Sequence, residues 1–226
     1  MLSEKEVSLW RDAFEKFGAC EVPSNIFSKQ FQDYIKITSR SVVNHFTIKE
    51  KSNPQFVVKG VEKDLSKSMY NTFLGESMLQ FLTPLYSKIV QKNLVPTYSF
   101  FRRYNKTNSL SPHRDRPSCQ YSVTIQIDAS ENTIWPIVFN TLNNKIISTK
   151  GGLFSPVFYQ GEKVLHWRDP LEYDYSTHLF LHYVDNDDEY YSKFAFDGRS
   201  SLYENMSKKS LEKLDKLHTE MVGSPE

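Results

Sequence analysis

Glycine and long apolar runs are scarce in this chain of 226 residues. It contains 8 glycines, about half of the roughly 16 that the usual frequency of ~7% would give. Collagen-like repeats, glycine-rich linkers and glycine-loop nucleotide sites are therefore excluded as main themes. The apolar runs are far shorter than the roughly 18 residues of a membrane span, and no basic flank precedes an apolar stretch at the N-terminus. We expect a soluble, unsecreted, cytoplasmic protein that does not bind membranes.

The net charge is close to zero, and the number of cysteines is small. Lys and Arg total 28 against 27 Asp and Glu, which gives a net charge of +1. Such a chain has no long-range field to hold a phosphate backbone, so a general nucleic-acid binder is not expected. The two cysteines, Cys20 and Cys119, form neither a CxxC pair nor a disulfide framework, and we expect both to be reduced thiols.

Aromatic residues, by contrast, are abundant. They make up 14% of the chain, with 16 Phe and 13 Tyr. Such side chains supply large apolar area to a core, and one domain spanning residues 1–226 is expected.

Residues 1–95 carry mainly helical patterns. Ser3 and Glu6 form a capping-box pattern, and an apolar stripe follows until Gly18. A second helix is predicted after Pro23 and a third from about residue 69 to residue 90. Their apolar faces are interpreted as packing surfaces rather than cofactor contacts.

From Pro96 the pattern changes to short β-branched and aromatic runs. Strands are predicted over residues 98–104, 121–127, 135–139, 145–148, 157–159, 163–166 and 178–184. Closely spaced strands of this number suggest a sandwich or barrel over residues 96–185. Because helices come first and strands after, the class is α+β, with the helices bracing one face. Residues 186–226 form a C-terminal extension, with a short amphipathic helix predicted over residues 207–218.

Three residues form a candidate metal site. His113 and Asp115 are two positions apart, so they share a face on a strand or strand edge. His166 ends a later strand run, which an antiparallel barrel could bring back beside that pair. Two imidazoles and one carboxylate form the facial triad of non-heme Fe(II) oxygenases. An isolated HxD is a weak signal, since a surface histidine beside an aspartate is more common.

The flanking sequence resembles the prolyl-4-hydroxylase-like branch of the Fe(II)/2-oxoglutarate-dependent dioxygenases. The run from Arg103-Tyr104 through Leu110 to His113-Arg-Asp115 is similar to the family's first metal motif, although Thr107 or Asn108 stands where glycine is usual. Residues 159–168 resemble the hairpin into the distal histidine, and residues 180–185 the terminal barrel strand. The resemblance covers about residues 65–200 and depends on the joint order of these motifs.

This resemblance implies a double-stranded β-helix, the cupin-like jelly roll, with iron held by His113, Asp115 and His166. It implies Fe(II), 2-oxoglutarate and O2 as cofactor and cosubstrates, with succinate and CO2 as coproducts. Asp115 favours hydroxylation, since halogenases of the superfamily have a small residue there. The expected function is hydroxylation of an unactivated carbon of a small molecule such as an amino acid or metabolite.

One family feature is missing. The family usually anchors 2-oxoglutarate with Arg or Lys nine to twelve residues after the distal histidine, and residues 175–178 hold neither. A guanidinium suits that task because it clamps a carboxylate bidentately. Arg168 is the first predicted substitute, and Arg116 or Arg103 could also reach in from neighbouring strands. The other predicted cosubstrate residues are Tyr104, Ser176 and Gln126.

Further residues are predicted to surround the substrate: Arg116, Trp167, Arg103 and His178. His178 and His182 share a strand face, so a second metal centre is a minor hypothesis. His45 is expected to be structural and His218 solvent-facing. For each polar residue a structural role remains the alternative.

Three other functions remain open. The same chemistry on a peptidyl-prolyl or protein substrate is one. A cupin-like binding protein without catalysis is the second, favoured by the missing cation. A hydrolytic Zn(II) site is the third, but no separate general base is identifiable. The sequence does not identify the substrate, because we expect loops over residues 47–63 and 140–152, whose conformation it does not specify, to line the mouth. It does not give the oligomeric state either.

Overall fold

Three helices, separated by two short strands, form the first part of the chain, and the other strands of two antiparallel sheets follow them. The computed structural model describes residues 2–50, 67–131 and 133–199, excluding the side chains of residues 45–50. The helices are α1 (Glu4–Phe17), α2 (Lys29–Glu50), α3 (Phe73–Val90) and α4 (Tyr190–Phe194), with 3-10 turns η1 (Ser24–Ile26), η3 (Pro117–Cys119) and η4 (Ala195–Gly198). The strands are β1 (Ala19–Glu21), β2 (Lys67–Tyr70), β3 (Leu94–Asn105), β4 (Leu110–His113), β5 (Tyr121–Ala129), β6 (Val138–Asn140), β7 (Ile146–Ser148), β8 (Val157–Tyr159), β9 (Leu165–Arg168) and β10 (Tyr175–Asp185).

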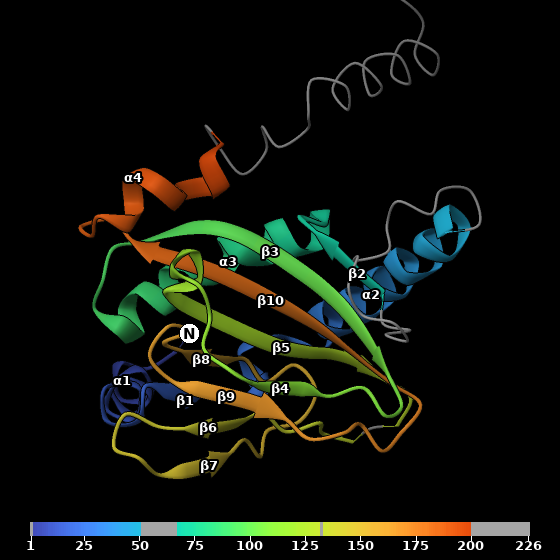
Figure 1. Cartoon of the computed structure of the whole chain (residues 1–226), viewed down its shortest axis with the longest axis horizontal. Coiled ribbons are helices and arrows are strands. Elements are labelled where there is room, and N and C mark those ends of the chain that lie inside the picture. The colour runs from blue at the N-terminus through green and yellow to red at the C-terminus, as the bar shows by residue number, and fades with distance from the viewer. Residues whose placement is uncertain (1, 51–66, 132, 200–226) are drawn as a thin grey trace, which may run out of the picture.

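The strands form a two-sheet roll. One sheet has the order β1-β8-β5-β10-β3-β2, and the other has the order β4-β9-β6-β7. In Figure 1 the smaller sheet lies to one side of the larger, with α2 and α3 behind the long strands. Every strand pair is antiparallel. The predicted α+β class is confirmed.

Helix α1 has the ends that the sequence predicts. The Ser3 side chain accepts a hydrogen bond from the Glu6 amide, and the Glu6 carboxylate accepts one from the Ser3 amide at 2.8 Å. Gly18 ends the helix at φ 76°, a left-handed conformation that glycine adopts at little cost. Thr72 caps α3 by accepting a hydrogen bond from the Gly75 amide at 3.0 Å.

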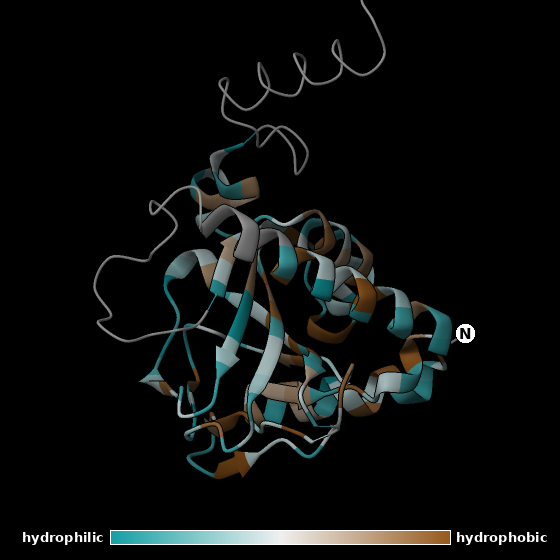
Figure 2. Ribbon diagram, turned by 90° about the vertical axis from the view of Figure 1, so that its right-hand side faces the viewer, coloured by the Kyte–Doolittle hydropathy of each residue, from teal (hydrophilic) through white to brown (hydrophobic). Residues whose placement is uncertain are grey.

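Strand alternation separates a dry core from the interior of the roll. On β10, Leu179, Leu181 and Tyr183 join the main apolar cluster with Leu79 and Tyr86 of α3. Figure 2 shows hydrophobic segments on the helices and on several of the strands. The alternate residues of β10 point the other way, between the two sheets. The interior of the roll thus receives the even-numbered side chains of β10, including all its histidines.

Several predicted boundaries are wrong. The third helix begins at Phe73, because residues 67–70 pair with β3 as the edge strand β2. The run 135–139 forms a strand only from Val138, and the run 163–166 only from Leu165. Strands β1, β2 and β4 were not predicted.

Other predictions concern composition and the chain ends. Both cysteines are free, as predicted, and the structure buries both of them. Within the described residues, no helix is long and apolar enough to cross a membrane. The predicted helix over residues 207–218, His218, the His45 side chain and most of the 47–63 loop lie outside the described part of the chain.

Candidate metal and ligand site

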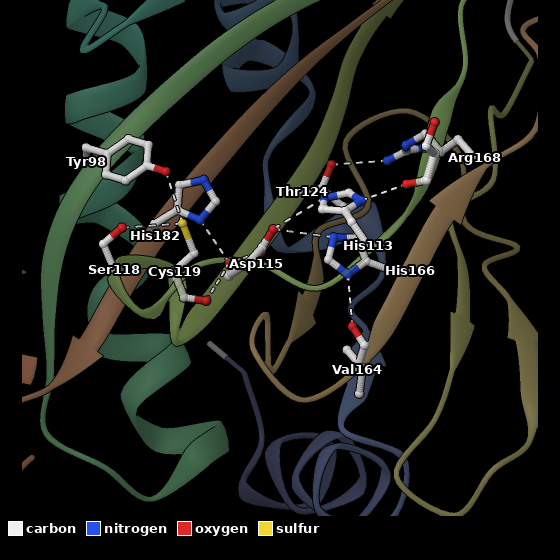
Figure 3. A network of polar contacts seen from close by, with 12 residues as sticks. Tyr98, His113, Asp115, Ser118, Cys119, Thr124, Val164, His166, Arg168 and His182 are labelled. Atoms are coloured by element: carbon white, nitrogen blue, oxygen red, sulfur yellow. Dashed lines mark hydrogen bonds and ion pairs between the residues drawn. The ribbon is translucent and has the colours of Figure 1, made fainter.

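The pairing of β4 with β9 brings the predicted metal ligands together. His113 and His166 are direct cross-strand partners, although 53 positions separate them in the numbering. Asp115 follows β4, and its amide donates to the Gly161 carbonyl at 2.9 Å. The three ligand atoms lie within 4.8 Å of one another. Figure 3 shows both imidazoles converging on the Asp115 carboxylate.

In their neutral forms, both histidines present an unprotonated Nε2 to this carboxylate. His113 Nδ1 is 2.8 Å from the Ser111 carbonyl, and His166 Nδ1 is 3.0 Å from the Val164 carbonyl. A carbonyl only accepts, so each Nδ1 carries the proton and each Nε2 keeps its lone pair when the ring is neutral. The Nε2 atoms lie 3.5 and 3.6 Å from Asp115 Oδ1. Ligands bonded to one ion at about 2.0 to 2.2 Å have separations of this order.

The protonation states suit a divalent cation. Burial raises the pKa of Asp115, but the hydrogen bond with His113 and the nearby histidines offset this, and the net pKa is lowered. Burial lowers the pKa of His166. The hydrogen bond to Asp115 raises the pKa of His113. Near neutral pH, Asp115 is thus an anion and His166 a neutral imidazole, which are the forms that bind metals.

A hydrogen-bonded pair behind Asp115 fixes its orientation. Ser122 Oγ donates to Asp115 Oδ2 at 3.0 Å and lies 2.8 Å from His182 Nδ1. Ser122 and His182 are cross-strand partners on β5 and β10. Because the single hydroxyl proton of Ser122 goes to Asp115, His182 Nδ1 is the donor to Ser122. Outer partners of this kind orient metal-binding carboxylates.

Gly161 leaves the space in which this carboxylate sits. A Cβ there would lie 2.2 Å from the Cys119 carbonyl oxygen, 2.5 Å from Asp115 Oδ2 and 2.9 Å from Ser122 Oγ. Any other residue at this position must displace backbone or the carboxylate.

A cavity of about 420 Å³ opens beside the three ligands. His113, Asp115 and His166 line it, together with His182 and Cys119. Apart from Leu110, the remaining lining is aromatic and cationic: Tyr70, Tyr98, Phe100, Tyr104, Tyr159, Phe180, Arg102, Arg114 and Arg116. The cluster thus faces a space large enough for a small molecule.

Arg168 is buried in the roll and does not line the 420 Å³ cavity; it lines a smaller pocket beside Thr124 and Trp135. It follows His166 by two residues on β9, so both side chains point to the same side of the strand. The guanidinium donates to the Trp135 carbonyl and to Thr124 Oγ1, while its Nε is buried without a hydrogen-bond partner. Burial lowers the pKa of Arg168 to about 10. No carboxylate of the described chain forms an ion pair with it.

His178 is a second buried group with an unpartnered atom. Its Nε2 is 2.8 Å from Ser176 Oγ, while its Nδ1 has no hydrogen-bond partner. Burial first and the charge of Arg168 second lower its pKa well below the ordinary value. The Tyr104 ring packs against it at 5.8 Å between centroids. Arg168, His178 and Tyr104 thus surround one buried polar region.

Other predicted residues have different roles. Gln126 holds the segment before β6: its amide donates to Tyr173 and the Thr133 carbonyl, and its oxygen accepts from the Trp135 amide. Arg116 lines the cavity, and its role toward a substrate stays a prediction. Trp167 alternates with His166 and does not line the cavity. Arg103 stacks on Tyr175 at 3.6 Å, on the opposite face of β3 from Tyr104.

The structure contains a second group of possible metal ligands, but this group is not the pair of His178 and His182 that the sequence suggested. Asp115, Cys119 and His182 have ligand atoms within 4.8 Å of one another. His178 belongs to no metal-competent group among the described residues. The sequence reasoning missed Ser122, and it also missed Arg102 and Arg114 as lining residues. Strand alternation with Tyr104 was the available signal for Arg102.

The sequence matches no protein-family model, and no curated protein sequence matches it significantly. Solved structures, however, share the fold. AviO1 from Streptomyces viridochromogenes Tue57 aligns with a TM-score of 0.63 at 13% identity, covering 82% of this chain and 98% of that one. A prolyl-4-hydroxylase from Pseudomonas putida aligns with a TM-score of 0.59 at 11% identity, over 79% and 98%. This chain has the double-stranded β-helix fold.

A third similar structure contains bound ligands. The epimerase SnoN of nogalamycin biosynthesis aligns with a TM-score of 0.60 at 9% identity, covering 81% of this chain and 85% of that one, in a complex with Fe3+, alpha ketoglutarate and nogalamycin RO. Related folds thus accompany hydroxylation and epimerisation in different proteins. At these identities the comparison establishes the fold, and the activity must be argued from this chain's own residues.

Proposed function

We propose that this chain is an Fe(II)- and 2-oxoglutarate-dependent oxygenase that oxidises a small molecule. The observation that carries the proposal is the convergence of His113 Nε2, His166 Nε2 and Asp115 Oδ1 at the wall of the 420 Å³ cavity. A set of two imidazoles and one carboxylate leaves coordination positions open on one side of an iron. Bound iron and 2-oxoglutarate would together supply the O2 activation that oxidises a substrate carbon and yields succinate and CO2.

The buried cation supports the cosubstrate part of this proposal. We assign the distal carboxylate of 2-oxoglutarate to Arg168, with His178 and Tyr104 beside it. The Arg168 Nε and His178 Nδ1 atoms are both buried without partners, and a buried donor left unpaired is costly. A carboxylate bound between them would satisfy both, with the neutral His178 donating from Nδ1. Arg168 stands about two residue rises, roughly 6 to 7 Å, from His166 along β9.

The strongest argument for a non-catalytic cupin-like protein is that the usual cation for 2-oxoglutarate is missing. The cation missing from residues 175–178 is replaced by one on the neighbouring sheet, at position 168. The chain's own contribution is to hold the ligands in fixed tautomers, orient Asp115 through Ser122 and shield the site with aromatic side chains. Asp115 favours hydroxylation as the outcome, and the cavity volume favours a small molecule over a protein substrate.

The test is cosubstrate turnover by metal-loaded protein. Succinate formation from 2-oxoglutarate should require Fe(II) and O2. It should fall by at least about 100-fold in His113→Ala and Asp115→Ala, because each variant removes one ligand. Lys145→Gln, at an exposed position on the β6-β7 connection, serves as the matched control and should keep wild-type turnover. Equal turnover in the wild type and both ligand variants would contradict the proposal.

A further inference from the structure

The mouth of the cavity concentrates positive charge in a chain whose net charge is only +1. Three arginines line it: Arg102 on β3, and Arg114 and Arg116 on either side of Asp115. Asp115 is the sole acidic residue lining this cavity in the described structure. A divalent cation on the ligands would more than cancel that carboxylate. The cavity is thus electropositive before and after metal binding.

Arg114 and Arg116 are available to a ligand. Arg114 uses its Nε to donate to the Lys163 carbonyl at 3.1 Å, which steadies the side chain and leaves its terminal nitrogens to solvent. Arg116 lies over the Tyr98 ring at 4.9 Å from the centroid and hydrogen-bonds with Tyr98 and Cys119, which holds its guanidinium at the cavity wall without neutralising its charge. Within residues 2–50, 67–131 and 133–199, no carboxylate forms an ion pair with either guanidinium. Both residues are exposed at the rim rather than packed in the core.

Aromatic rings line the cavity on the side of β2, β3 and β10. We call Tyr70, Tyr98, Phe100 and Phe180 the aromatic wall. Tyr70 contacts Phe100 at 4.7 Å and Tyr98 at 5.6 Å between centroids, and Phe100 is 6.1 Å from Phe180. Tyr70 is 55% exposed although it is a large ring. Such surface is suited to stacking against a flat or apolar ligand.

We propose that the cavity binds a small molecule that carries a carboxylate or phosphate group on a flat, apolar body. Arg114 and Arg116 hold the oxyanion, because a guanidinium gives charge-assisted and bidentate hydrogen bonds to such groups. The aromatic wall packs against the body. This inference rests on the proposed oxygenase function and names its substrate class. It assigns the rim arginines to substrate, whereas the buried Arg168 is left to 2-oxoglutarate.

The experiment compares matched probes on anaerobic protein loaded with Fe(II) and saturating 2-oxoglutarate. The probes are 2-naphthoate, 2-naphthyl phosphate and the neutral 2-naphthamide, with binding followed by the fluorescence anisotropy of the naphthyl group. We expect at least one anion to bind about tenfold or more tightly than the amide, with a preference that weakens as salt rises. The two anionic probes distinguish a carboxylate site from a phosphate site.

Two variants test whether the rim arginines cause the preference for anionic probes. Arg114→Gln combined with Arg116→Gln should remove the anion preference, while Lys145→Gln should retain it. Equal binding of amide and anions by the wild type, or a preference that survives in the double variant, would overturn the inference. The visible absorption band of Fe(II) with 2-oxoglutarate, recorded in every sample, separates the two proposals. Absence of the band refutes the oxygenase function, whereas a band without anion preference refutes only the substrate class.

Discussion

Replacing Gly161 by alanine is expected to weaken metal binding without removing any ligand. The new methyl group would lie 2.2 Å from the Cys119 carbonyl oxygen and 2.5 Å from Asp115 Oδ2. Both distances are far inside van der Waals contact, and the carbonyl belongs to backbone that cannot rotate away. The Asp115 carboxylate is the easier group to move, although Ser122 donates a hydrogen bond to it and the Asp115 amide is fixed by its bond to the Gly161 carbonyl. The substitution therefore displaces a ligand through packing alone.

The size of the expected effect follows from the cost of overpacking and from the cost of disturbing a metal ligand. Overpacking a well-filled site costs about 1 to 3 kcal/mol. Disturbing the support of a ligand typically lowers metal affinity by about 10 to 100-fold, which corresponds to about 1.4 to 2.8 kcal/mol. We expect Gly161→Ala to lose metal affinity within that range and to unfold at a lower temperature than the wild type.

The assay is calorimetric titration of the apoprotein with Mn(II), a redox-stable stand-in for Fe(II), alongside thermal unfolding. Gly152→Ala is the matched control, because a Cβ at Gly152 would meet nothing within 4 Å. The control should bind Mn(II) like the wild type. Wild-type Mn(II) affinity in Gly161→Ala would refute the claim that Asp115 must occupy its observed position.

Three further predictions concern the groups around the ligands. Arg168→Gln should raise the dissociation constant of 2-oxoglutarate on Mn(II)-loaded protein by about 100-fold, since two charge-assisted hydrogen bonds are lost; unchanged binding in calorimetry would exclude Arg168 as the anchor. Ser122→Ala should weaken Mn(II) binding about tenfold, because Asp115 Oδ2 and His182 Nδ1 lose their shared partner. An affinity equal to that of the wild type would show that Ser122 and His182 do not orient Asp115. Because burial keeps His178 neutral in the folded state, the unfolded state binds an extra proton below about pH 6.5. The free energy of unfolding should therefore fall with decreasing pH, and His178→Gln should reduce that slope in urea unfolding at about pH 7.5 and pH 5; an unaltered slope would contradict the reasoning.

Local sequence patterns were enough to place the ligands on their elements. His113 and Asp115 share a motif, and His166 ends a recognisable strand run, so each was found separately. Their meeting depends on the pairing of β4 with β9, a contact between distant residues that no local pattern specifies. Ser122 and His182 were harder, because only the register of β5 against β10 makes them partners. Long-range register is a property of the folded chain.

For some residues, the sequence itself contains a signal that differs from the prediction. Trp167 lies between His166 and Arg168, so strand alternation already assigned it to the opposite face. Arg103 is related to Tyr104 in the same way. The start of α3 was misjudged because residues 69 and 70 continue an apolar pattern, although Thr72 offered a helix cap.

The most direct test of the oxygenase account is a spectrum recorded without oxygen. The apoprotein is titrated with Fe(II) in the presence of saturating 2-oxoglutarate while visible absorption is followed. The account predicts a charge-transfer band that needs both additions, saturates at about one Fe(II) per chain and is absent in His166→Ala. Iron that binds with no such band, or a band that persists in His166→Ala, would contradict it.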